Sequence, residues 1–206
     1  MSTLDVLREA LRGEMSLARY AHTLGVEAAV AKMAKLYCPE KEMMLRAAAL
    51  LHDLTKEYTP DMQEAVLLRE GIVLRPDEAA TVAVHHAITA PAEIKRRYPD
   101  YANEALLSAV RWHTTLREGM TLSEALLYLA DVIEEGRTYE ACVALRERFF
   151  GADLAAMDET ARQEHLVRVL LESLCGVRES VIKKGGTVCL DTERAIAYLT
   201  MKKTLL

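Results

Sequence analysis

The chain has 206 residues, of which 51% are hydrophobic and 28% charged, a balance typical of a globular protein and unlike that of a disordered or membrane chain. A formal net charge of −5 argues against a nucleic-acid partner, since such proteins usually carry a basic excess. No apolar run reaches the length of a membrane helix, and the four cysteines form no C-x-x-C pair. The polar start at Met1 lacks signal-peptide features, which predicts a cytoplasmic protein.

Apolar residues recur at helical spacing almost from end to end, which predicts an all-α fold. Expected helices cover residues 2–12, 17–37, 41–56, 60–70, 76–97 with a break near Pro91, 103–113, 121–135, 138–149 and 156–184, before a short closing helix within 185–206. No long linker or internal repeat divides the chain. We therefore expect one domain over 1–206, with the core motifs in about 17–137 and closing helices in 138–206.

Histidines and one aspartate stand out because they occupy apolar positions. His22 is in phase with Val26 and Met33 on one helix face. A hydrogen-bonded core imidazole would explain any single histidine equally well. Asp131 is different, because it lies in a long apolar run and burying an unpaired carboxylate costs several kcal/mol. Imidazoles and carboxylates that meet inside a helical bundle suit a divalent metal, and the absence of thiolates favours iron, manganese, cobalt or nickel at least as much as zinc.

Four segments resemble the motifs of a known family. They are Arg19-Tyr20-Ala21-His22-Thr23-Leu24-Gly25-Val26, Leu51-His52-Asp53-Leu54-Thr55-Lys56, His113-Thr114-Thr115-Leu116-Arg117 and Ala130-Asp131-Val132-Ile133-Glu134-Glu135-Gly136-Arg137. These segments are similar to those of the YqeK family, bacterial HD-domain hydrolases that split dinucleoside tetraphosphates symmetrically. The resemblance runs from about residue 10 to the end. It implies an HD-domain helical bundle with a metal site in its core.

The resemblance also implies which residues bind the metal. The expected ligands of one divalent ion are His22, His52, Asp53 and Asp131. Iron is the usual occupant in the family, with manganese or cobalt as alternatives. His86 and His113 are expected to complete a second metal position, bridged by Asp53, or to touch phosphate. Helix phase favours His86 over its neighbour His85 for this role.

A further set of residues is expected to contact the substrate. Arg19 and Lys56 each lie three positions from a ligand on the same helix face, and Arg137 follows the helix that carries Asp131. A solvated surface charge is the ordinary alternative for each cation. The other expected substrate contacts are His86, His113, Thr114, Thr187, Val188, Cys189, Leu190, Asp191 and Thr192. The residues expected to act in catalysis are Asp53, Lys56, His86 and His113.

Three departures from the family pattern concern the substrate pocket. Leu116 stands where the family typically has glycine, and Glu135 stands where it usually has proline. The segment 187–192 lacks the usual prolines, although in relatives it lies against the nucleotide. None of these changes removes a ligand. They bear on the shape of the pocket and on the preference for base and chain length.

The resemblance implies a metal-dependent hydrolase that cleaves diadenosine tetraphosphate into two nucleoside diphosphates. A small dinucleoside polyphosphate is then the expected partner, with no nucleic acid and no membrane. A twofold homodimer is compatible with a helical protein of this size. Another HD phosphohydrolase, acting on a nucleoside monophosphate or a cyclic dinucleotide, is the nearest alternative. A di-iron oxygenase and a non-catalytic nucleotide sensor are the alternatives from other classes.

Overall fold

The structure, a computed structural model, describes residues 3–202, 204 and 205. All regular elements within this part of the chain are helices, which confirms the all-α prediction. The α-helices are α1 (Thr3–Arg12), α2 (Leu17–Tyr37), α3 (Glu42–Leu51), α4 (Pro60–Glu70), α5 (Pro76–Ala80), α6 (His85–Arg97), α7 (Glu104–Trp112), α8 (Leu122–Ile133), α9 (Glu140–Phe150), α10 (Glu159–Lys183) and α11 (Leu190–Met201). Parts of the predictions above that fall on residues 1, 2, 203 and 206 lie outside the described residues.

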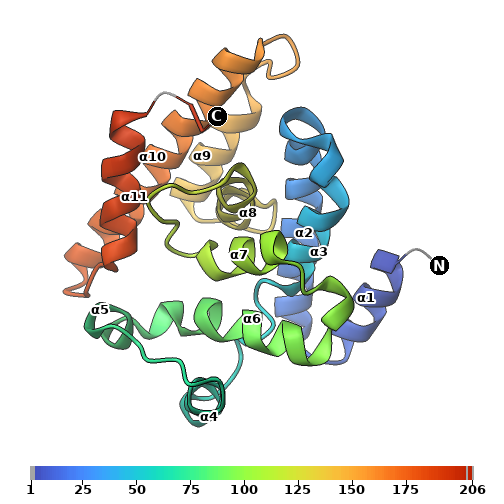
Figure 1. The fold of residues 1–206 in the computed structure, drawn as a ribbon. Coiled ribbons are helices and arrows are strands. Elements are labelled where there is room, and N and C mark those ends of the chain that lie inside the picture. The colour runs from blue at the N-terminus through green and yellow to red at the C-terminus, as the bar shows by residue number, and fades with distance from the viewer. Residues whose placement is uncertain (1–2, 203, 206) are drawn as a thin grey trace.

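Helix α8 lies near the centre of the molecule, with α2 and α3 on one side and α9, α10 and α11 on the other (Figure 1). Helix α2 packs along α3 and against α8, and α7 packs against α3, α6 and α8. Helices α4, α5 and α6 lie along the lower side of the molecule in this view, and α4 packs against α6 (Figure 1). Elements from the two halves of the chain therefore meet at α8.

Side-chain caps explain why several helices begin where they do. The hydroxyls of Ser16, Thr59 and Thr121 each accept a hydrogen bond from a backbone N–H in the first turn of the following helix. At Thr121 the Glu124 carboxylate also accepts from the Thr121 N–H, which completes a capping box. Asp158 caps the long helix α10 in the same way. Such polar residues just before apolar runs make these starts readable from the sequence.

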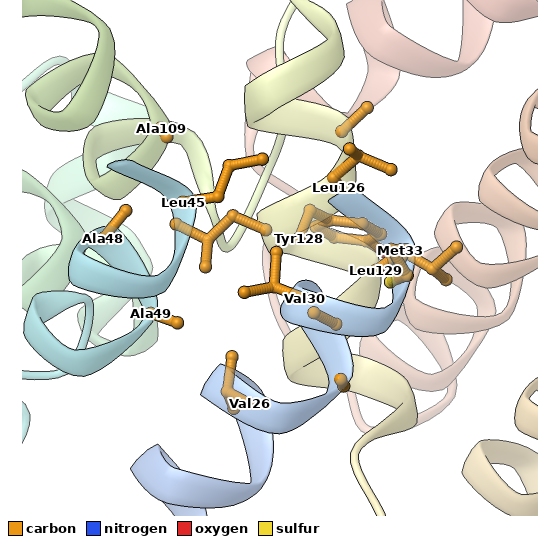
Figure 2. Packing of buried hydrophobic residues seen from close by; sticks show 14 of the residues in the cluster. Val26, Val30, Met33, Leu45, Ala48, Ala49, Ala109, Leu126, Tyr128 and Leu129 are labelled. Atoms are coloured by element: carbon orange, nitrogen blue, oxygen red, sulfur yellow. The ribbon is translucent and has the colours of Figure 1, made fainter. Parts of the chain in front are cut away.

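The core between α2, α3 and α8 is apolar and closely packed (Figure 2). Val26, Val30 and Met33 of α2 are fully buried there. On the neighbouring helix α3, Ala48 and Ala49 are buried as well, and such small side chains let two helices approach closely. This packing brings α2 and the end of α3 together, and those are the elements that carry His22 and the His52-Asp53 pair.

Two predicted helix boundaries were wrong. The helix expected over 41–56 ends at Leu51, and residues 52–57 form tight turns with bonds such as Lys56 N to Asp53 O. The Thr55 hydroxyl donates to the His86 carbonyl, and the Thr55 carbonyl accepts from Gln63, so this turn is tied to α6 and α4. Those tertiary bonds replace the helical ones that continuing α3 would have made.

The break predicted near Pro91 was wrong as well, because α6 runs through that proline. The interruption instead falls at residues 81–84, which separate α5 from α6 with a 3-10 turn. A proline inside a helix removes one hydrogen bond and costs about 3 kcal/mol. Ala87, Ala90 and Ile94 are fully buried on the same helix, and this burial offsets the cost.

Leu116 is the non-glycine residue with a positive φ, 54°, among the described residues. Its N–H donates to the Trp112 carbonyl and ends the turn after α7, and its side chain is fully buried in the core. A left-handed conformation costs a non-glycine residue roughly 1–2 kcal/mol, whereas burying a leucine side chain contributes about 2–5 kcal/mol. The leucine is therefore retained by its burial and not by its backbone preference.

We expect both Leu116→Gly and Leu116→Ala to lower the free energy of unfolding, because each removes a buried side chain. The glycine variant should be the more stable of the two by about 1 kcal/mol, since only glycine is unstrained at this φ. Urea denaturation of the two variants measures the difference. An alanine variant as stable as the glycine variant, or more so, would contradict the strained backbone at Leu116.

Candidate metal centre

Side chains from five helical regions, α8 among them, converge on one place inside the molecule. His22 comes from the second turn of α2, and His52 and Asp53 directly follow α3. His86 lies in the first turn of α6, His113 directly follows α7, and Asp131 projects from α8. All six residues that the sequence analysis nominated as metal ligands are therefore neighbours in space.

One group of nitrogen and oxygen atoms faces a single oxygen of Asp53. His22 Nε2 lies 3.0 Å from Asp131 Oδ1 and 3.7 Å from Asp53 Oδ2, and His52 Nε2 lies 3.4 Å from the same Asp53 oxygen. The Nε2 atoms of His22 and His52 are buried and make no hydrogen bond to any described residue. Buried nitrogens left unpaired beside carboxylate oxygens form a donor set that fits a divalent transition metal.

A second group of atoms faces the other oxygen of Asp53. His86 Nε2 lies 3.2 Å and His113 Nε2 3.7 Å from Asp53 Oδ1, and the two Nε2 atoms are 3.1 Å apart. Asp53 thus presents one carboxylate oxygen to each pair of imidazoles. This is the arrangement in which one carboxylate can bridge two ions.

Hydrogen bonds behind the imidazoles determine which ring nitrogen faces the centre. The Nδ1 atoms of His52 and His113 lie 2.6 Å from the carbonyls of Ala49 and Val110. Because a carbonyl only accepts, Nδ1 must carry the proton in both rings, and Nε2 then offers its lone pair to the centre. Both rings are held in the tautomer that a metal ligand needs.

Glu134 plays the corresponding part behind His22, and sequence reasoning did not single it out. Its Oε1 lies 3.1 Å from His22 Nδ1, and its Oε2 accepts from the Gly136 N–H at 2.5 Å. Gly25 makes room for this carboxylate, because a Cβ at Gly25 would lie 2.3 Å from Glu134 Oε2. The signal available in the sequence was the position of Glu134, three residues after Asp131 and in the same motif.

The pKa values of the two carboxylates and of His86 suit metal binding, whereas Asp53 and Asp131 outweigh burial at His52 and raise the pKa of that imidazole. Burial alone would raise the pKa of Asp53 and Asp131, but the neighbouring imidazoles hold both pKa values well below their usual range. Burial lowers the pKa of His86 to about 4, so this imidazole is neutral at neutral pH. Ionised carboxylates and neutral imidazoles are the forms that coordinate metals.

The three cations that the sequence analysis expected to contact phosphate all lie beside the centre. Arg19 pairs with Asp53 Oδ2, and Arg137 Nη2 lies 2.6 Å from Asp131 Oδ1. Lys56 Nζ lies 3.3 Å from both ring nitrogens of His86, and burial lowers the pKa of this lysine. His85, by contrast, contacts the Glu78 carbonyl instead of the centre, which agrees with the preference for His86.

A cavity of about 260 Å³, here called the C-terminal cavity, opens beside the centre. It is lined by Lys56, His113, Thr114, Asp131, Thr187, Val188, Cys189 and Thr192 among others. The hydroxyl of Thr114 is buried without a hydrogen-bond partner among the described residues. The structure thus brings most of the expected substrate contacts to one wall. Leu190 and Asp191 differ, because Leu190 is exposed and the Asp191 carboxylate pairs with Arg75.

An ion-pair network holds this C-terminal wall in place. Asp77 Oδ2 accepts from the Leu190 N–H at 2.8 Å and from the Cys189 thiol at 3.4 Å. Arg75 pairs with both Asp77 and Asp191. The segment after α10 is thereby fixed to α5, a contact between residues more than a hundred positions apart that the sequence pattern did not indicate.

No helix in the described part of the chain is long and apolar enough to cross a membrane. A family model for the HD domain matches residues 19–136. A Bacillus subtilis protein named symmetrical bis(5'-nucleosyl)-tetraphosphatase is 27% identical over 174 residues, which cover 84% of this chain and 85% of the relative. A protein of the same name from Halalkalibacterium halodurans is 28% identical over 174 residues, covering 84% of each chain.

A solved structure from Clostridium acetobutylicum, described as a predicted HD superfamily hydrolase involved in NAD metabolism, superposes with a TM-score of 0.82 at 28% identity and covers 98% of each chain. These matches confirm the resemblance seen in the sequence motifs. The matched region begins at Arg19, just before the first histidine of the centre, and ends just beyond Asp131 and Glu134. The chain therefore belongs to the HD domain family and is an HD-type phosphohydrolase.

Proposed function

We propose that this protein cleaves dinucleoside tetraphosphates such as diadenosine tetraphosphate in the middle of the phosphate chain, releasing two nucleoside diphosphates. The observation that carries the proposal is the pairing of a buried His/Asp centre with three cations, Arg19, Lys56 and Arg137, directly beside it. A polyphosphate carries negative charge on many oxygens, and these three cations can bind them. The two curated relatives named above support the choice of substrate.

The metal of this enzyme is proposed to be a divalent ion, iron in the first place, with manganese or cobalt as substitutes. Its ligands are proposed to be His22, His52, Asp53 and Asp131, and His86 and His113 would complete a second position that shares Asp53. An ion held there supplies Lewis acidity and lowers the pKa of water bound to it towards neutrality.

The protein's own groups have two tasks in this reaction. Arg137 and Arg19 each have donors beside the carboxylates, where they can bind phosphate oxygens and orient the chain. Lys56, half-buried beside His86, can neutralise the charge that develops on the departing diphosphate. Burial of the Asp53 carboxylate strengthens its interaction with Arg19, because less water is present to screen it.

A second candidate substrate follows from the solved neighbour, whose description links it to NAD metabolism. NAD, like a dinucleoside tetraphosphate, consists of two nucleosides joined through phosphates. The activity assay therefore includes NAD as a separate substrate, and cleavage of NAD alone would favour this candidate over the tetraphosphate.

We expect protein loaded anaerobically with iron, manganese or cobalt to convert diadenosine tetraphosphate to ADP as the sole nucleotide product. The Asp53→Ala variant should be inactive, because it removes the carboxylate that faces both groups of imidazoles. Anion-exchange chromatography of the products is the measurement, and Asp100→Ala, a change at an exposed aspartate, is the matched control. Formation of ATP plus AMP, or survival of the substrate, would show that the enzyme is not a symmetrical hydrolase.

We expect Glu134→Gln to weaken metal binding by about 10–100-fold. Two donors, His22 Nδ1 and the Gly136 N–H, face the two oxygens of Glu134, and a glutamine would turn its own donor towards one of them. Gly25→Ala should weaken binding in the same direction, because its Cβ displaces this carboxylate.

Metal titration of the apo-protein measures both effects. The control is Gly176→Ala, another helical glycine, whose added Cβ would meet nothing within 4 Å. This control should leave metal affinity unchanged and stabilise the protein by up to about 1 kcal/mol. Equal metal affinities in the Gly25 and Gly176 variants would refute the positioning role of Glu134.

A further inference from the structure

A second cavity adjoins the centre and is lined by residues of α4, of the turns before it and of residues 82–86. This α4 cavity, about 420 Å³ in volume, is lined by Tyr58, Leu67, Val82 and His86 among others. It shares two wall residues, Lys56 and Ala83, with the C-terminal cavity. The two cavities therefore adjoin each other at a lysine that lies beside the metal centre.

Each cavity reaches the centre through a different histidine. His113 lines the C-terminal cavity and His86 lines the α4 cavity, and their Nε2 atoms are 3.1 Å apart and face the same oxygen of Asp53. A molecule with its middle at this oxygen can consequently extend one end into each cavity. This layout matches a substrate whose two ends are alike and whose reacting bond lies at the middle.

The walls of the α4 cavity suit an apolar, planar group. Pro60, Leu67 and Val82 supply apolar surface, and Val82 is 69% exposed at the rim. The Tyr58 hydroxyl donates to Glu93, which holds the ring at the cavity wall. Nucleoside pockets combine such apolar and aromatic walls with a few polar groups, and the α4 cavity is larger than the C-terminal cavity, at about 420 Å³ against about 260 Å³.

A third hollow at the centre has a different character. It is lined by Ser16, Arg19, Glu57, Arg137 and Thr138 beside His22. Ala18 and the exposed Tyr139 also line it, but most of its side chains are polar or charged, so the hollow suits phosphate groups better than a base. The α4 cavity is accordingly the better partner of the C-terminal cavity for binding a second nucleoside.

We propose that the α4 cavity binds the second nucleoside of a dinucleoside tetraphosphate, while the first nucleoside occupies the C-terminal cavity. The inference rests on the proposed function for its substrate, and it explains why cleavage would fall at the middle of the chain. With one nucleoside in each cavity, the central phosphates lie beside Lys56, His86 and His113, where the two cavities adjoin. Binding at both ends then selects the central bond as the one that reacts.

The test fills the α4 cavity without touching the centre. Leu67→Trp places an indole in the cavity, and the matched control Leu68→Trp makes the same change at the next position of α4, where the side chain is 75% exposed. Calorimetric titration of ADP into manganese-loaded protein should give two ADP per chain for the wild type and for Leu68→Trp. The same titration should give one ADP per chain for Leu67→Trp.

Kinetics with two substrates provide the second readout. Leu67→Trp should raise the KM for diadenosine tetraphosphate about tenfold or more, a change equivalent to about 1.4 kcal/mol. It should leave the KM for adenosine 5'-tetraphosphate, which has a single nucleoside, within twofold of the wild-type value. Leu67 also packs against the cluster of Val84, Ile88 and Cys189, so Val82→Glu, at the exposed rim of the α4 cavity, is measured in parallel. We expect the same loss of one ADP from this variant.

Binding of a single ADP by the wild type, or an equal rise in KM for both substrates, would overturn the inference. Failure of the proposed function has a different signature, namely that the wild type releases no ADP from diadenosine tetraphosphate. Because the ADP count does not depend on turnover, it tests the two cavities even in that case.

Discussion

The burial of two carboxylates in the middle of a helical bundle is the constraint on which the rest of the structure depends. Asp53 and Asp131 lie among apolar helices, where an unpaired carboxylate costs several kcal/mol. Imidazoles and guanidinium groups surround them and keep both ionised. The elements that bring these partners, α2, α3, α6, α7 and α8, are also the elements that pack most closely on one another. Stability of the fold and charge at the centre are therefore coupled.

The ends of helices α3 and α7 contribute both to the stability of the fold and to the orientation of the imidazoles at the centre. A helix end leaves its last carbonyls without partners inside the helix, and those groups must bond elsewhere. His52 and His113 each follow such an end and bond to the carbonyl three residues before them, Ala49 and Val110. One contact thus satisfies the helix end and directs Nε2 towards Asp53. His22 lies inside a helix, and the Glu134 carboxylate contacts its Nδ1 as the backbone carbonyls contact Nδ1 of His52 and His113.

The C-terminal helices matter because they complete a cavity that the central helices leave open. Asp77 and Arg75 help to fix the segment 187–192, which lines this cavity, to α5. The position of this cavity wall therefore depends in part on the ion pairs of Arg75 with Asp77 and Asp191, which lie away from the metal centre. Substitutions at such positions can change substrate preference without altering a ligand.

The sequence by itself determined the helical class, most helix limits and the six histidine and aspartate residues of the centre. Helical periodicity and caps such as Ser16 and Thr121 are local signals, and a carboxylate like Asp131 in an apolar run is visible without a structure. The end of α3 at Leu51, the course of α6 through Pro91, the role of Glu134 behind His22 and the pairing of Asp191 with Arg75 were decided by the tertiary structure. Each of these depends on contacts between residues far apart in the chain, whose energies no local pattern records.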